Sequence, residues 1–303
     1  MPASITLASL TFALPDGRVL FSDLNFSFNQ ERVGLVGRNG IGKSTLLDLI
    51  GGRAAPTSGA VVVSGTIGML PQAFGVDAGE TVADLFGVRA ALAQLARIGA
   101  GMGAEADLAD ADWTLEARFA EALSRAGLAD VGAETPLATL SGGQRMRARL
   151  AALIFSGPDF LLLDEPTNNL DREGRAGVAQ LLSAWRGGAI VVSHDRELLE
   201  GMDAIVELTS LGAARYGGGW SQYEAQKARA LASAQQDLSE AQRRLDEVAE
   251  KAQAASERKA RRDGAGSRKA ARGGAPRILL GALKNRAEES SSALNRLAER
   301  QRS

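Results

Sequence analysis

The sequence predicts an α/β domain built on a parallel β-sheet, followed by a long charged segment. The glycine-rich stretch GRNGIGKST at 37–45 follows an apolar strand candidate at 31–37 and runs into a helical pattern. Short apolar strands and helical segments then alternate, as in domains whose parallel strands are joined by helices. After residue 216 the composition changes, and small and apolar residues recur at helical spacing.

The elements of the first domain can be read in chain order. Alternating or continuous apolar residues mark strand candidates within 3–28 and at 31–37, 61–63, 67–70, 160–164 and 189–193. A helix is expected to start near Lys43 and to end at Gly51–Gly52. Residues rich in Ala and Leu at helical spacing predict a helical subdomain at about 80–156, which includes a helix at 143–156. We place the first domain at residues 1–216.

Residues 217–303 are predicted to form an antiparallel helical hairpin. An apolar seam from Leu231 to Ala255 is sustained over about four heptads, which indicates a helix that packs along one partner. This first arm is expected at 221–262, a length of about 60 Å. Glycines at 264, 266, 273 and 274 and a proline at 276 are expected to end it, and a shorter return helix could run from about Arg277.

The predicted tip of the hairpin, at about 251–286, is strongly basic. It carries eleven Lys and Arg residues, opposed only by Glu257 and Asp263, although the whole chain has a formal charge of −1. Such asymmetry favours a polyanionic partner such as structured RNA, and a solvated helix is the plainer alternative. No aromatic residue follows Tyr223, so base stacking at the tip is not indicated.

Composition excludes several classes of protein. The chain has no cysteine, which rules out disulfides and thiolate metal sites. No basic residue precedes Arg18, so a secretory signal is not expected. The apolar runs are far shorter than the roughly 20 residues that span a bilayer. We therefore expect a cytoplasmic protein without membrane insertion.

The glycine-rich stretch predicts a site for a nucleoside triphosphate. Gly37, Gly40 and Gly42 allow backbone N–H groups to surround phosphate oxygens, and the following helix adds its positive end. Lys43 would reach the β- and γ-phosphates, and the hydroxyl of Ser44 would bind Mg²⁺. The full set of ATP-binding candidates in this stretch is Gly37, Arg38, Asn39, Gly40, Ile41, Gly42, Lys43, Ser44 and Thr45.

Four further polar residues follow strand candidates and could complete a hydrolytic site. Asp164 ends the apolar strand FLLLD, where a carboxylate can hold Mg²⁺, and Glu165 is the candidate general base for an attacking water. Gln72 could join the metal shell and sense the γ-phosphate. His194, the only histidine in the chain, follows the strand at 189–193 and could contact the γ-phosphate.

A second anion site is predicted at LSGGQ, residues 140–144. Ser141, Gly142, Gly143 and Gln144 open a helix, and a serine cap with glycines at a helix N-terminus can bind an anion. Because the glycine-rich stretch already provides one such site, this second site is expected to serve ATP held by another domain. Phe12 could stack on adenine or could equally be a core residue of its strand.

Taken together, these motifs resemble an ATP-binding cassette domain. The stretch 37–45 matches its Walker A motif, Gln72 its Q-loop, 140–144 its signature and 160–165 its Walker B motif, with a D-loop at 168–171 and His194 as the switch histidine. The run from LSGGQ through DEPTNNLD more narrowly resembles the ABC-F family, with Asn169 where that family usually has histidine. YGGGWSQYE at 216–224 resembles the family's lead into its interdomain linker, with Trp220 in place of the usual tyrosine.

The resemblance implies a P-loop NTPase cassette with an antiparallel β subdomain and a helical subdomain, followed by the helical hairpin. It implies ATP and Mg²⁺ as cofactors, with Glu165, His194 and Gln72 in hydrolysis and Ser44, Gln72 and Asp164 at the metal. ABC-F proteins carry two cassettes and act on the ribosome at its tRNA exit site, with the linker tip toward tRNA. A second cassette, in a longer chain or in a second copy, and the ribosome, rRNA or tRNA are therefore the expected partners.

Two other function classes were compared with this hypothesis. The nucleotide-binding subunit of an ABC transporter is the main alternative, although it would need a membrane partner and would leave the basic hairpin without a role. In the coiled-coil ATPases of chromosome maintenance, long coiled coil separates the two phosphate motifs. Here Asp164 follows Lys43 by only 121 positions, which excludes that class.

Overall fold

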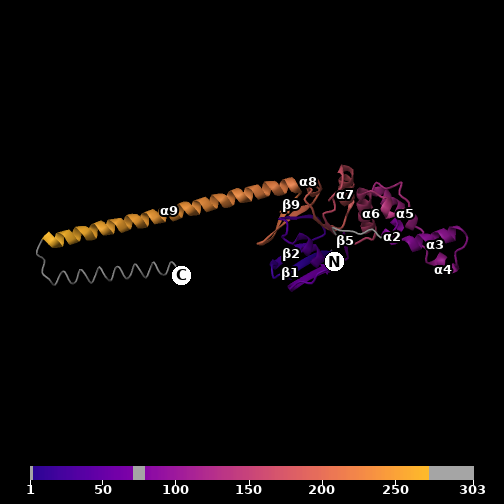
Figure 1. Ribbon diagram of the computed structural model, residues 1–303, viewed down its shortest axis with the longest axis horizontal. Coiled ribbons are helices and arrows are strands. Elements are labelled where there is room, and N and C mark those ends of the chain that lie inside the picture. The colour runs from indigo at the N-terminus through magenta and orange to yellow at the C-terminus, as the bar shows by residue number, and fades with distance from the viewer. Residues whose placement is uncertain (1–2, 71–78, 273–303) are drawn as a thin grey trace. The chain divides into compact units, whose positions relative to one another are not determined.

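The computed structural model describes residues 3–70 and 79–272 and contains an α/β domain followed by a long helix. By contacts, the chain divides into two units, residues 1–229 and 230–303. This division falls later than the expected boundary after Tyr216, because the long helix α9 begins at Trp220 and its first turns pack on the first unit (Figure 1).

The main sheet of the first unit has six strands in the order β5-β6-β7-β3-β8-β9. Their bounds are Ile67–Leu70 for β5, Phe160–Asp164 for β6, Gly188–Val192 for β7, Arg32–Gly37 for β3, Ala204–Thr209 for β8 and Gly212–Gly217 for β9. All neighbours are parallel except β8 and β9, which form an antiparallel edge pair. The predicted parallel sheet is thus confirmed.

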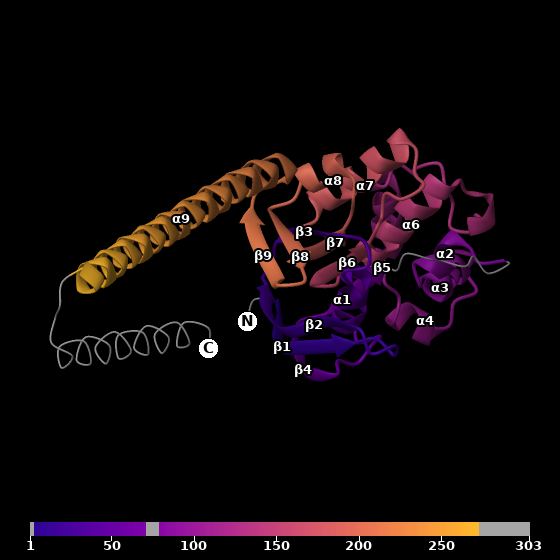
Figure 2. The ribbon, with the colours of Figure 1, turned by 60° about the vertical axis from the view of Figure 1, so that its left-hand side comes forward.

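A second sheet is antiparallel and has three strands in the order β2-β1-β4. They span Ser4–Ala13 (β1), Val19–Phe28 (β2) and Ser58–Ser64 (β4). Helix α1, Lys43–Ile50, packs its leucines into the apolar core that this sheet shares with one face of the main sheet (Figure 2). This core pins the start of α1, and with it the glycine-rich stretch, between two sheets.

Helices cover the other face of the main sheet and form a second core. They are α2 (Val82–Leu85), α3 (Arg89–Gly99), α4 (Glu105–Ala109), α5 (Leu115–Arg125), α6 (Gly142–Phe155), α7 (Arg172–Ala184) and α8 (Arg196–Glu200), with a short 3-10 helix at Leu137–Thr139. Every residue of β6 and β7 is buried, and successive residues of β6 point into opposite cores. A parallel sheet covered on both faces explains why these strands are continuously apolar.

The second unit contains most of α9, which runs from Trp220 to Arg272. The expected break at Gly264 and Gly266 is wrong, because the helix continues through both. A glycine costs a helix only about 1 kcal/mol relative to alanine and keeps its N–H donor, whereas proline removes that donor. The return arm expected from Arg277, and Pro276 before it, lie outside the described residues.

The apolar seam of the first arm is exposed. Leu231, Leu238, Leu245 and Val248 are 55% to 69% solvent-accessible. Across residues 3–70 and 79–272, no helix combines the length and the apolar character needed to cross a bilayer.

Candidate functional site

The glycine-rich stretch forms an open helix start. Gly42, the residue before α1, adopts φ 105°, a left-handed conformation that favours glycine. Among the described residues no side chain caps the N-terminus of α1, so its first N–H groups have no side-chain acceptor there. The ammonium of Lys43 donates to the carbonyl oxygens of Gly37 at 2.9 Å and Arg38 at 3.4 Å. The loop thus curls around its own lysine, next to unpaired backbone donors.

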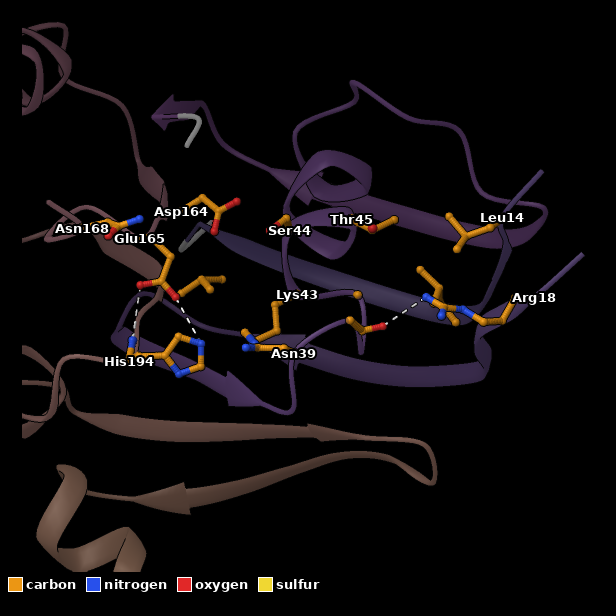
Figure 3. A pocket seen from close by; sticks show the side chains of 14 residues that line it. Leu14, Arg18, Asn39, Lys43, Ser44, Thr45, Asp164, Glu165, Asn168 and His194 are labelled. Atoms are coloured by element: carbon orange, nitrogen blue, oxygen red, sulfur yellow. Dashed lines mark hydrogen bonds and ion pairs between the residues drawn. The ribbon is translucent and has the colours of Figure 1, made fainter. Parts of the chain in front are cut away.

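The ends of β6 and β7 bring the predicted hydrolytic residues to the same place. Because these strands are parallel and adjacent, their carboxyl ends meet at one edge of the sheet. The N–H of Glu165 donates to Val192 O at 2.8 Å, and the backbone N–H of His194 donates to Glu165 Oε2 at 3.4 Å. His194 Nε2 also lies 3.4 Å from Glu165 Oε1, as Figure 3 shows.

Glu165 adopts φ 49°, an unusual conformation for a residue with a side chain. This conformation costs a non-glycine residue about 1–2 kcal/mol. The bond from Glu165 N to Val192 O and the contacts with His194 hold the residue in place. This backbone conformation directs the carboxylate of Glu165 toward His194 and the cleft (Figure 3).

Burial shifts the ionisation of the charged groups in the cleft. Asp164 is 7% exposed, and within residues 3–70 and 79–272 its Oδ1 has no hydrogen-bond partner. Burial raises the pKa of Asp164, although the hydroxyl of Ser44 opposes the shift. Burial also raises the pKa of Glu165 and lowers the pKa of the Lys43 ammonium. A buried carboxylate oxygen without a partner is what a hard divalent cation would satisfy, so Asp164 and Ser44 fit a Mg²⁺ site.

These groups share one cleft of ≈ 570 Å³ (Figure 3). Of the predicted residues, Asn39, Gly40, Gly42, Lys43, Ser44, Thr45, Asp164, Glu165 and His194 line it. Three motifs that are up to 155 positions apart in the chain (39 to 194) therefore converge on one surface.

Five further residues line the cleft, namely Leu14, Arg18, Leu20, Asn168 and Val192. Of these, only Asn168 lies in a motif expected from the sequence, the D-loop at 168–171. Arg18 Nη2 donates to Gly40 O at 3.4 Å, so this cation joins the glycine-rich stretch. Leu14 and Leu20 flank the turn between β1 and β2 and form an apolar wall. The only local signal was the turn sequence PDGR at 15–18, which does not indicate which part of the fold the turn will contact.

Several predicted residues lie elsewhere. Phe12 is paired with Phe21 in the β1–β2 ladder, packs against the core, and does not line the described part of the cleft. Ile41 also packs against this core. Gly37 and Arg38 line a neighbouring pocket behind the glycine-rich stretch. Gln72 lies outside the described residues.

The second predicted anion site forms a separate helix start. The hydroxyl of Ser141 accepts a hydrogen bond from the N–H of Gln144 at 3.2 Å, and the side chain of Gln144 accepts from the N–H of Ser141 at 2.9 Å. Gly143 lies beside Asp171, the N-cap of α7. A Cβ built on Gly142 would meet no described atom within 4 Å. The fold of this chain therefore gives no steric reason for a glycine at 142.

Comparisons with known proteins agree with this geometry. Residues 21–168 match the family model described as ABC transporter. The chain is 36% identical over 258 residues to "Tylosin resistance ATP-binding protein TlrC" of Streptomyces fradiae, with 76% of this chain and 47% of that protein covered. It is 34% identical over 254 residues to "Energy-dependent translational throttle protein EttA" of Mycobacterium tuberculosis, covering 76% and 45%. It is also 34% identical over 201 residues to "ABC transporter F family member 3" of Arabidopsis thaliana, covering 66% and 26%.

Among solved structures, the chain is similar to one titled "An inward-facing conformation of a putative metal-chelate type ABC transporter", with a TM-score of 0.55 and 25% identity over 71% of this chain and 83% of that one. The chain spans about half the length of the first two curated relatives, 47% and 45%.

Proposed function

Because the chain belongs to the ABC-F family of ATP-binding cassette proteins, we propose that it binds ATP with Mg²⁺ and hydrolyses it to ADP and phosphate. The observation that carries this proposal is the convergence of Lys43, Ser44, Asp164, Glu165 and His194 on one cleft. Each of these residue types has a distinct task in phosphoryl transfer to water.

The binding half of the site is the open start of α1. Its uncapped N–H groups and the ammonium of Lys43 would surround the phosphates, because both present positive charge to the cleft. When bound, Mg²⁺ would neutralise charge on the phosphate oxygens. The Ser44 hydroxyl and the unpartnered oxygen of Asp164 would hold the metal. Gln72 remains a proposed third ligand from the segment outside the described residues.

The hydrolytic half is Glu165 with His194. Burial raises the pKa of Glu165, which makes its carboxylate a stronger base toward an attacking water. His194 lies 3.4 Å from that carboxylate and is 59% exposed toward the cleft. We assign Glu165 the role of general base and His194 a contact to the γ-phosphate.

Ser141, Gly142, Gly143 and Gln144 are proposed to contact ATP held by a second cassette, in a longer chain or a second copy. They do not line the described part of this chain's own cleft, and a Cβ on Gly142 would meet no described atom within 4 Å. Close approach of a phosphate to the backbone is a reason for glycine that the fold itself does not supply. The adenine role of Phe12 has no support from its core packing and is not part of the proposal.

The segment 217–303 is proposed to be the linker that reaches the ribosome, through contacts of its basic tip with rRNA or tRNA in the cytoplasm. Its excess of Lys and Arg would release counterions from RNA phosphates. One relative is named a translational throttle protein, which supports a role in translation, and another is named for tylosin resistance, which supports antibiotic protection. The alternative, a transporter subunit, is supported only by the fold shared with transporter cassettes.

The substitution Glu165→Gln tests the enzymatic part of the proposal. It should keep ATP affinity and lower turnover by at least about 100-fold, because general bases contribute factors of this size. Glu173→Gln, on the exposed start of α7, is the matched control and should hydrolyse ATP at the parent rate. If Glu165→Gln also did so, Glu165 would not be the base.

Ribosome binding is tested separately by replacing Arg258, Lys259, Arg261 and Arg262 with glutamine. Co-sedimentation with ribosomes at moderate salt should weaken while ATP affinity stays unchanged, because the removed charges belong to the arm alone. Unchanged co-sedimentation would eliminate the RNA role of these residues. Purification with a membrane subunit would favour the transporter alternative.

A further inference from the structure

The loop that carries His194 has few contacts within the cleft. We call residues 193–195 the switch loop. Both contacts of His194 with Glu165 are long, at 3.4 Å, and both go to one carboxylate. The histidine side chain is also 59% exposed. Its position therefore depends strongly on the helix that follows it, α8, whose N-cap is Asp195.

The start of α9 holds α8 at both of its ends. We call residues 219–227 the arm root; they lie in the first unit, beside α8 in both Figure 1 and Figure 2. At the start of α8, the guanidinium of Arg196 lies 5.1 Å from the centroid of a Trp220 ring and 3.7 Å from Glu224 Oε1. At its end, Glu200 Oε2 accepts hydrogen bonds from the N–H and the hydroxyl of Ser221, at 2.8 Å and 3.0 Å.

The backbones of these two segments also approach closely. A Cβ built on Gly219 would lie 2.3 Å from Glu200 O, so a side chain at 219 would force the arm root away from α8. Gly218 N donates to Asp203 O at 2.9 Å, which ties the same turn to the loop after α8. The arm root and α8 are thus held together by close backbone packing as well as by charged side chains.

The arm root is also anchored to β8, the neighbour of the strand β3 that leads into the glycine-rich stretch. Lys227 forms an ion pair with Glu207 and donates to the Tyr223 hydroxyl at 3.0 Å. Glu207 lies in β8, directly opposite Val36, the last residue of β3 before Gly37. Tyr223 is 5% exposed, so this anchor is part of the core.

Between these contacts lies a pocket of ≈ 380 Å³ that reaches His194 itself. Its lining includes Arg38, His194, Arg196 and Trp220, so the switch loop and the arm root share one wall with the back of the glycine-rich stretch. Within the described chain, the indole Nε1 of Trp220 is buried without a hydrogen-bond partner. The pocket offers room in which α8 and the switch loop can shift.

From this geometry we infer that the arm root positions the switch loop, which makes Trp220 and Glu224 positioning residues for hydrolysis at Glu165. This inference rests on the proposed ATPase function. The arm root contacts α8 at both of its ends, α8 positions His194, and His194 contacts the carboxylate of Glu165. Because coupling between two sites is reciprocal, closure of the cleft on nucleotide would also change the contacts of the arm root.

The expected effect is moderate. An exposed ion pair shifts an equilibrium by no more than about fivefold, and an exposed cation–π contact by about the same factor. Removal of one contact should therefore lower turnover by about two- to fivefold, and removal of both by about tenfold. ATP affinity should stay within about twofold, because neither Trp220 nor Glu224 lines the ATP cleft.

The test compares Glu224→Gln with Glu240→Gln in the full chain. Both acids lie on α9 and each faces an arginine at 3.7 Å, but Glu240 belongs to the second unit and pairs with Arg244 on the same helix. His194 is the only histidine in the chain, so its imidazole gives a single reporter signal in a ¹³C-histidine NMR spectrum once purification tags are removed. Glu224→Gln should displace this signal and lower turnover, while Glu240→Gln should change neither.

The double variant Trp220→Phe with Glu224→Gln should increase both effects. Trp220→Phe keeps an aromatic ring in the pocket, and Glu224→Gln alone tests the inference if the double variant fails to fold. An unmoved His194 signal in Glu224→Gln would overturn the inference, as would equal changes in Glu240→Gln. Failure of the ATPase proposal is distinct, since it would appear as unchanged turnover in Glu165→Gln while the NMR comparison remained decisive.

Discussion

The chain contains two glycine-bearing helix starts that differ in how they are capped. At α1, the residue before the helix is Gly42 in a left-handed conformation, and no described side chain caps the N–H groups. At α6, Ser141 and Gln144 cap each other reciprocally, and Gly142 has ordinary helical geometry with open space around it. The N-terminus of α1 thus lacks a side-chain cap among the described residues, whereas the N-terminus of α6 is capped by Ser141 and Gln144.

The difference indicates that the two glycine motifs bind their ligands in different ways. The α1 start lies beside Lys43, Asp164 and Glu165, so its ligand is held by groups of the same chain. The α6 start has no such neighbours in the cleft, and its Gly142 is free of any steric demand from the fold. The first site is therefore expected to bind nucleotide by itself, and the second to act only when another cassette approaches.

The largest effect should come from Lys43→Ala. This change should weaken ATP binding by about 100-fold, or about 2.7 kcal/mol. The reason is that it removes the ammonium that lies at the glycine-rich loop and would contact the phosphates. Arg145→Ala at the other helix start, where the guanidinium donates to Leu140 O, should leave that affinity unchanged. Titration with a fluorescent ATP analogue measures both. An affinity within threefold of the parent in Lys43→Ala would remove the distinction between the two sites.

The two glycines should respond differently to alanine. Gly42→Ala should lower the free energy of unfolding by about 2 kcal/mol, because φ 105° disfavours a side chain and the new Cβ would lie 2.7 Å from the Phe21 ring. Gly142→Ala should change it by less than about 0.5 kcal/mol. Urea unfolding of both variants checks this. A large loss in Gly142→Ala would show that the fold itself requires that glycine.

Removal of the cap at α6 should have a smaller effect. Ser141→Ala should cost about 1 kcal/mol of stability, because the N–H of Gln144 loses its acceptor. Ser141→Thr, which keeps the hydroxyl, should restore most of it, and thermal unfolding measures the difference. ATP binding to this chain's own cleft should be the same in all three proteins, and a change there would contradict the separation of the two sites.

The last predicted effect is a gain in stability, similar in size to the loss expected for Ser141→Ala. Burial raises the pKa of Asp164, so the ionised carboxylate costs the nucleotide-free protein stability at neutral pH. Asp164→Asn should therefore raise the free energy of unfolding by about 1 kcal/mol at pH 7. The advantage should vanish as pH falls below the ordinary aspartate pKa of about 3.9, where the parent side chain is neutral in both states.

Thermal unfolding across this pH range, with Ser183→Ala on the exposed face of α7 as a neutral control, measures the gain. Loss of stability in Asp164→Asn at pH 7 would show that the Ser44 hydroxyl and the charge of Lys43 stabilise the carboxylate more than burial destabilises it. Addition of Mg²⁺ and ATP should reverse the order of the two proteins, because only the parent keeps the metal ligand.

Much of the site could be predicted because its motifs are local. The glycine-rich turn before the helix at Lys43, the apolar strand that ends at Asp164 and the serine cap at 141 each depend on a few consecutive residues. The same kind of reasoning failed at Gly264 and Gly266, where it predicted a helix break. The helix continues there, since glycine weakens a helix without ending it. Whether the expected hairpin turns back after Pro276 lies beyond the described residues.

The sequence by itself determined the parallel sheet, the open helix start and the identity of the groups that carry charge, because these follow from local spacing and chemistry. Only the tertiary structure decided that Arg18 meets Gly40, that the partly buried Phe12 packs against the core, and that Trp220 lies over Arg196 beside the switch loop. The physical reason is that these contacts join segments distant in the chain. Their formation depends on the order of strands in the sheet and on how the helices pack across it, which no short stretch of residues encodes.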